Sequence, residues 1–284
     1  MIAYIITVFV LSWGAQIIAI KKAKSRTSEG IEYGKVSSII MMFVMLMPSL
    51  VLLAFVAFGV IVWDWAAFGL IPFNFPGWVL AFFVTILYTV AVFFALKRYS
   101  DFPHLKIDNK GRWRIDNIGT LLDKIIPPPK KPSIYIFDIL LSIFVSAITL
   151  VPLALGEELA WRGFMQPIFI DRIGSIGGIL ALGLIWGLWH LPMNLAGHND
   201  AKSPKLDAFV FFILKAISLS AVFGWLRIVT GSVWPVAFAH AVNNASLLMR
   251  GLVPRISHIK YQIIGTAIYV AFGILGFWLI HVTT

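Results

Sequence analysis

The chain has 284 residues, of which 60% are hydrophobic and only 13% are charged, and its mean hydropathy is +0.89. This composition indicates a polytopic membrane protein and argues against a soluble domain. Cysteine is absent, which excludes disulfides, thiolate metal sites and a cysteine nucleophile. The net charge of +10 lies in short loops between apolar runs, as membrane topology requires, so it does not indicate nucleic-acid binding.

Three membrane helices are predicted in the first half of the chain, at Ile2–Ile20, Ser38–Trp63 and Trp78–Leu96. The first has no basic segment before it, so we expect a retained span rather than a removable signal peptide. Basic residues follow it up to Lys35 and are predicted to be cytoplasmic, which places the N-terminus outside. The loop at 64–77 has no Lys or Arg and is rich in aromatic residues, which is typical of an outer loop.

The only long polar segment of the sequence, residues 97–132, follows the third helix. It holds nine lysine and arginine residues and closes with the proline run Pro127–Pro129. We interpret this segment as a basic cytoplasmic loop that lies against anionic lipid headgroups. An arm that binds nucleic acid is the alternative, and we do not favour it.

Five further helices bring the expected total to about eight, in one all-α membrane domain covering residues 1–284. They are predicted at Ser133–Ile170, Ser175–Leu195, Leu206–Leu226, Val233–Leu248 and Gln262–Ile280. An even number of spans places both termini outside. The first of the five is unusually long, so we expect it to be tilted, kinked at Pro152 or partly interfacial.

Three ionisable side chains, Glu157, Glu158 and Arg162, interrupt this long apolar helix. One such charge at the bilayer centre costs about 2.5–3.5 kcal/mol or more, so a functional site is the default expectation. Glu158 and Arg162 lie four residues apart on one helix face and can pair. Glu157 lies about 100° further round the helix, without an obvious local partner. A carboxylate in that position is typical of a general base or a metal ligand.

The fifth predicted helix ends with Trp186–x–x–x–His190, just before Pro192. Gly183 and Gly187 in the same helix form a pair of small residues that lets another helix approach closely. The histidine is the first candidate for a group that Glu157 faces across the bundle.

The seventh predicted helix carries His240 and Asn244, four residues apart on one face, with Asn243 beside them. Polar groups on three helices would compensate one another best in a single pocket, so we predict that they meet. The helices of residues 133–249 would then hold the site. A purely structural polar network is the alternative.

These motifs together resemble the signature of the intramembrane CAAX proteases. These are the type II prenyl endopeptidases of the broader CAAX-protease and bacteriocin-processing family. The resemblance rests on Glu157–Glu158–x–x–x–Arg162, Trp186–x–x–x–His190 and His240–x–x–x–Asn244, in this order. It covers the chain from about Ser133 to Met249. The family usually has Phe where Trp186 stands, and this exchange of aromatic residues leaves the histidine untouched.

The resemblance implies removal of the last three residues of a prenylated protein, after its lipidated cysteine. Glu157 would be the general base and His190 its helper in activating water, while His240 and Asn244 would form the oxyanion site. Glu158 and Arg162 would hold the helix and tune Glu157. The expected partners are prenylated protein or peptide C-termini and membrane lipids, with no nucleic acid. We expect an integral protein of the plasma membrane or endoplasmic reticulum, with its site reached from the cytoplasm.

Aromatic side chains flank the motif residues and can line an apolar slot for the lipid chain. They are Trp161, Phe164, Trp186 and Trp189. Ordinary packing or lipid contact is the alternative for each of them.

A metal-free mechanism is the preferred prediction. The alternative is a zinc protease acting on a hydrophobic peptide, with Glu157, His190 and His240 as a His₂Glu ligand set. That mechanism needs a further general base, and it leaves Asn244 without a role because a neutral amide is a poor zinc ligand. A transporter or proton relay and a non-catalytic membrane binding protein also remain open.

Overall fold

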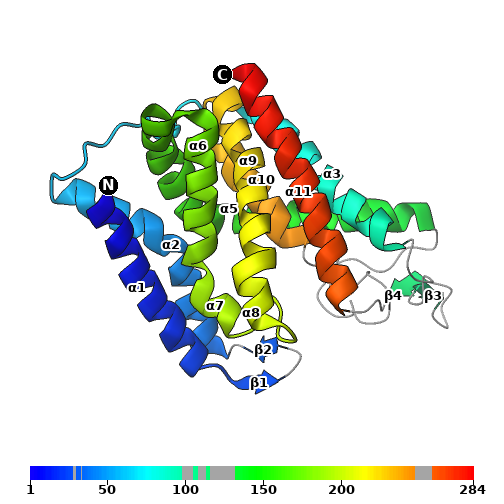
Figure 1. Cartoon of the computed structure of the whole chain (residues 1–284). Helices are drawn as coiled ribbons and strands as arrows, with labels where there is room; N and C mark the ends of the chain where they lie inside the picture. Colours follow the sequence, from blue (N-terminus) through cyan, green and yellow to red (C-terminus); the bar gives the residue numbers. More distant parts are fainter. Residues whose placement is uncertain (28–29, 33, 98–104, 108–112, 116–131, 247–257) are drawn as a thin grey trace.

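The computed structural model describes residues 1–27, 30–32, 34–97, 105–107, 113–115, 132–246 and 258–284 (Figure 1). The helices are α1 (Ile2–Lys21), α2 (Lys35–Ala57), α3 (Phe75–Lys97), α5 (Pro132–Glu158), η1 (Leu159–Met165), α6 (Gln166–Trp189), α7 (Leu191–Leu195), α8 (Pro204–Leu206), η2 (Asp207–Phe211), α9 (Phe212–Thr230), α10 (Trp234–Ser246) and α11 (His258–Thr283). Helices η1 and η2 are π-helices. Two short antiparallel pairs join strands β1 (Ser25–Thr27) and β2 (Gly30–Glu32), and β3 (Leu105–Ile107) and β4 (Trp113–Ile115). The predicted all-α class is confirmed, with these hairpins as additions.

Six segments of the described chain are long and apolar enough to cross a membrane. One of them, Leu140–Trp189, is 50 residues long and contains parts of both the fourth and the fifth predicted helices. The seventh predicted helix corresponds to α10, which has 13 residues and is shorter than a membrane span. The expected count of about eight is therefore approximate.

A sharp turn at Ile173 and Gly174 divides the long segment in two. Gly174 has φ of +77°, a left-handed conformation that glycine adopts without steric cost. Beyond the turn the chain folds back, and a Cβ on Gly178 would lie only 2.7 Å from the backbone of Phe169. The part of α6 after Gly174 thus returns alongside the part before Ile173 and brings His190 back toward the depth of Glu157. The predicted boundary between Ile170 and Ser175 agrees with this turn.

The α6–α9 contact depends on the glycine pair of α6. A Cβ on Gly183 would lie 2.8 Å from the Cα atom of Ile217, and one on Gly187 would lie 2.8 Å from the side chain of Ile213. The predicted close approach of another helix is confirmed, and that helix is α9. Figure 1 shows α6, α9 and α11 side by side, with α9 in the middle, in agreement with their contacts.

Different segments of the described chain form the two ends of the bundle. At one end, the loop between α2 and α3 is tied to the α9–α10 turn: Val233 N–H donates to Gly69 O (2.8 Å), and Arg227 donates to Ala67 O (2.9 Å). The end of α1, the start of α2, α8 and the start of α11 lie at the opposite, lower end in Figure 1, and seven lysines lie in or beside these segments of the sequence. They are Lys21, Lys22, Lys24, Lys35, Lys202, Lys205 and Lys260. Most of the predicted basic loop of residues 97–132 lies outside the described residues.

Candidate active site

The second glutamate of the motif, Glu158, is held by an ion pair and by a hydrogen bond. Glu158 is the last residue of α5, and its carboxylate lies 2.9 Å from the guanidinium of Arg162. The same carboxylate accepts a 2.7 Å hydrogen bond from Nδ1 of His240 on α10. Arg162 also donates to Ser220 Oγ on α9 (3.1 Å). All of these side chains are buried. The network therefore compensates a buried charge and fastens three helices to one another.

Glu157 has a different environment from its neighbour. Its side chain is buried and borders a cavity of about 430 Å³. The indole N–H of Trp186 donates to its carboxylate at 2.8 Å. A π-helix begins directly after the two glutamates, and such wide turns are frequent at functional sites. One hydrogen bond from a neutral group orients this carboxylate while leaving it on the cavity wall.

His190 follows the last residue of α6, and its ring has a defined tautomer. Nδ1 lies 2.8 Å from the carbonyl oxygen of Trp186, and because a carbonyl only accepts, Nδ1 carries the hydrogen. Nε2 of the neutral ring then has a lone pair. Helix α1 stabilises this end of α6, because Trp13 and Gln16 both donate to the terminal carbonyl of Trp189, at 3.1 and 3.0 Å.

A chain of hydrogen bonds fixes the amide of Asn244. Tyr88 on α3 and Tyr269 on α11 both donate to Oδ1 of Asn243. The amide nitrogen of Asn243 therefore points the other way, and it donates to Oδ1 of Asn244 at 3.2 Å. With its oxygen occupied, Asn244 keeps its NH₂ group as the donor for the cavity, which it borders.

All four predicted catalytic residues, Glu157, His190, His240 and Asn244, line the same cavity. They come from α5, the end of α6 and α10, three elements that the sequence separates by up to 87 positions. The rest of the wall includes apolar side chains from α2, α6, α7 and α9. They are Met41, Met42, Val44, Met45, Trp186, Trp189, Met193, Phe212 and Leu219. A polar wall thus shares one space with a larger apolar surface.

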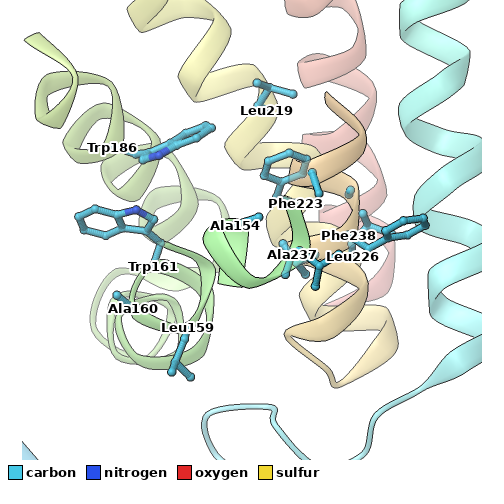
Figure 2. Close-up of a cluster of buried hydrophobic side chains, with 14 of the residues drawn as sticks. Ala154, Leu159, Ala160, Trp161, Trp186, Leu219, Phe223, Leu226, Ala237 and Phe238 are labelled. Carbon is cyan, nitrogen blue, oxygen red and sulfur yellow. The ribbon is translucent and has the colours of Figure 1, made fainter. Parts of the chain in front are cut away.

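Two of the four aromatic residues of the predicted apolar slot lie at the cavity. Trp186 and Trp189 line the cavity, but Trp161 and Phe164 do not. Trp161 is fully buried in the core, where it packs edge-on against Trp189, and Phe164 packs against Tyr4. Both lie within η1, after the glutamates. Figure 2 shows the indoles of Trp161 and Trp186 on one side of the core, with Leu219 and Phe223 of α9 across from them.

The histidines and carboxylates of the cavity are also the residue types that bind metal ions. In the part of the chain that the structure describes, no three or more His, Asp or Glu side chains form a group that could hold a metal ion. Both site histidines use Nδ1 for a second hydrogen bond, to Trp186 O and to Glu158. Such bonds orient metal-binding histidines, but they equally fix a histidine that binds water.

Several residues that hold the site were not identified from the sequence. They are Trp13, Gln16, Tyr88, Ser220 and Tyr269. Each is a single polar or amphipathic group in an apolar helix. The buried Gln16 is the strongest signal among them, because an amide in a membrane helix needs hydrogen-bond partners.

Residues 137–246 match the family model of the type II CAAX prenyl endopeptidases described as Rce1-like. This segment runs from within α5 to the last residue of α10 and contains all six residues of the charged and polar motifs. No match was found among curated proteins. Together with the six apolar helices, the family match identifies an integral membrane protein. The segment that holds the site is a domain of the Rce1-like family of type II CAAX prenyl endopeptidases.

Proposed function

We propose that this protein is an intramembrane endopeptidase that removes the C-terminal tripeptide of prenylated CAAX-type proteins, with Glu157 activating the attacking water. The observation that carries the proposal is the difference between the two glutamates. Glu158 is held by Arg162 and His240, whereas Glu157 borders the cavity and accepts the indole N–H of Trp186. A carboxylate oriented in this way, on the wall of a cavity, suits a general base.

In the proposed reaction, Glu157 takes a proton from a water molecule whose oxygen attacks the scissile carbonyl carbon. Nε2 of His190 accepts the other hydrogen of that water and so orients it. The developing oxyanion is bound by the NH₂ group of Asn244 and by Nε2–H of His240 in its imidazolium form, which Glu158 stabilises. Glu157 then passes its proton to the leaving amine, the C–N bond breaks, and the tripeptide is released.

The apolar wall is suited to the lipid part of the substrate. Met41, Met42 and Met45 of α2 line the cavity together with Met193 of α7. Methionine side chains are unbranched and flexible, so they adapt to a long chain without a fixed shape. We propose that the prenyl group packs on this wall while the peptide reaches Glu157.

We propose that the reaction proceeds without a catalytic metal. With Glu157 as base and His240 and Asn244 as donors, every polar group of the cavity wall near Glu157 has a function. A zinc mechanism needs a second acid at the metal-bound water. Glu158 is the nearest candidate, and it is already bonded to Arg162 and His240.

The site is proposed to be entered from the cytoplasm. The cavity is lined by residues near the start of α2, the α7–α8 connection and the start of α11, among them Ser38, Asn199 and Gln262. These places belong to the end of the bundle where the lysines gather, and lysine-rich loops are cytoplasmic in most membrane proteins.

The direct test is incubation of the purified protein with a farnesylated peptide that ends in three residues after the modified cysteine. Mass spectrometry should detect the free tripeptide and the shortened lipopeptide, and the same peptide without its lipid should react much more slowly. Absence of cleavage, or cleavage at another bond, would contradict the proposal.

A further inference from the structure

Helix α1 lies outside the segment that matches the family model, yet two of its side chains bind the peptide group that precedes His190. Trp13 and Gln16 are three residues apart on one face of α1. Both donate to the carbonyl oxygen of Trp189, at 3.1 and 3.0 Å. That carbonyl and the backbone nitrogen of His190 belong to one peptide group. Helix α1 is therefore bonded directly to the backbone unit that carries the imidazole.

The backbone at His190 departs from the regular helix. Helix α6 ends at Trp189, and His190 has φ of −83° and ψ of −2°, in the sparsely populated bridge region where many active-site residues lie. Pro192, two residues later, has no N–H to donate. The last carbonyl groups of a helix have no partner within it. The donors of α1 supply such a partner to Trp189 from another helix.

The direction of the imidazole depends on the same peptide group. Nδ1 of His190 is bonded to the carbonyl oxygen of Trp186 at 2.8 Å. The indole of Trp189 packs edge-on against the imidazole, with 4.6 Å between the ring centroids. A shift of the peptide between residues 189 and 190 would move both rings. Nε2 of His190 would then leave the place at which it meets the attacking water.

The bond from Gln16 contributes more to local geometry than to overall stability. Gln16 is fully buried, and its Oε1 has no hydrogen-bond partner among the residues that the structure describes. A buried amide with one unpaired atom gives little net stability, because its desolvation offsets the bond that the other atom makes. Removal of this amide should therefore leave the fold intact while it releases the peptide before His190.

We propose that Gln16 and Trp13 are positioning residues for catalysis, which hold the peptide group before His190 so that Nε2 of this histidine binds the attacking water. The inference rests on the proposed function, in which that nitrogen orients the water. It makes α1 a part of the catalytic unit, although the segment that matches the family begins at residue 137.

The test is steady-state cleavage of a farnesylated peptide by full-length Gln16→Met, together with its melting temperature. Methionine keeps the length of the side chain and removes the donor. We expect kcat to fall by about three- to tenfold, the range for one hydrogen bond, with KM and the melting temperature close to those of the wild-type protein. Trp13→Phe should behave in the same way.

Two further variants sharpen the test. In Trp13→Phe/Gln16→Met the carbonyl of Trp189 loses both donors, so kcat should fall by more than the product of the two single losses. Ser12→Ala is the matched control. Ser12 is buried one turn before Gln16, and its Oγ has no hydrogen-bond partner in the part of the chain that the structure describes. This control should keep wild-type kcat and KM.

The outcomes separate this inference from the proposed function. Absence of cleavage by the wild-type protein would overturn the proposed function and the inference with it. Wild-type kcat in the folded double variant would leave the endopeptidase in place and overturn only the role of α1. A fall in kcat that Ser12→Ala shares, or that comes with a lower melting temperature or loss of folding, would also overturn it, because general loss of packing explains such a result.

Discussion

Trp186 donates its indole N–H to the carboxylate of Glu157 at 2.8 Å and so joins α6 to the end of α5. Trp186 thus lines the cavity and also orients the carboxylate of Glu157. Phenylalanine, the residue usual at this position in the family that the sequence resembles, has no N–H to donate. In this chain the orientation of the proposed base depends on a side chain 29 residues away.

Replacement of Trp186 by Phe should therefore lower kcat with little change in KM. The expected loss is about three- to tenfold, since one hydrogen bond contributes about 1 kcal/mol. Trp189→Phe is a matched control, because Trp189 also lines the cavity and its indole N–H has no hydrogen-bond partner among the residues that the structure describes. Equal losses in both variants would show that the indole acts only by filling space.

A second prediction concerns the amide relay, the hydrogen bonds in which Asn243 accepts from Tyr88 and Tyr269 and donates to Asn244. Asn243→Asp keeps the acceptor for Tyr88 and Tyr269 but removes the donor that holds Oδ1 of Asn244. The amide of Asn244 would then turn its NH₂ group toward residue 243 and away from the cavity. We expect kcat to fall by about 10²–10³, as when one oxyanion donor is lost. Steady-state kinetics of Asn243→Asp, measured together with Asn244→Ala, check this expectation. Near wild-type activity of Asn243→Asp would show that the relay does not orient Asn244.

A third prediction concerns metal. Activity of the purified protein should persist after prolonged treatment with phenanthroline, and elemental analysis should find no stoichiometric zinc in active samples. One equivalent of zinc, with activity lost on its removal and restored on its return, would make Glu157, His190 and His240 ligands instead.

The absence of cysteine permits a clean test of topology. Lys202→Cys lies in the α7–α8 connection at the lysine-rich end, and Ala66→Cys lies in the loop between α2 and α3; both positions are exposed. An impermeant thiol reagent should label Ala66→Cys in intact cells and Lys202→Cys only after permeabilisation. The reverse pattern would place the cavity entrance on the outer side.

The sequence predicts the helices and the charged motif well because both follow from local rules. Apolar runs of sufficient length form helices, and the spacing of Glu158 and Arg162 places them on one face, where the structure shows them paired. The glycine spacing of α6 likewise predicts a close helix contact, although it does not identify α9 as the partner. Helical spacing also indicates that Glu157 faces away from that pair.

The contacts between helices could not be predicted from one sequence. The bond from His240 to Glu158 joins residues 82 positions apart, and nothing in the spacing shows which glutamate the histidine meets. The sequence could not show that Trp161 and Phe164 lie away from the cavity, because adjacency to a motif does not determine which way a side chain points in a π-helix. The donors from α1 and α3 were missed because isolated polar residues carry no periodic signal.

The central claim is that Glu157, and not Glu158, is the base. Glu158→Gln leaves a buried guanidinium without its charge partner, so it should lower the free energy of unfolding by about 3–5 kcal/mol and also lower kcat. Glu157→Gln keeps the shape of the side chain and removes the base, so its melting temperature should stay close to that of the wild-type protein. A comparison of melting temperature and turnover in the two variants thus separates loss of stability from loss of the base.

The most direct measurement is the turnover of Glu157→Gln on a prenylated peptide, made on protein whose folding and peptide binding have been checked. We expect normal binding with no detectable release of the tripeptide. Full or nearly full turnover by folded Glu157→Gln would contradict it and assign the base to another residue.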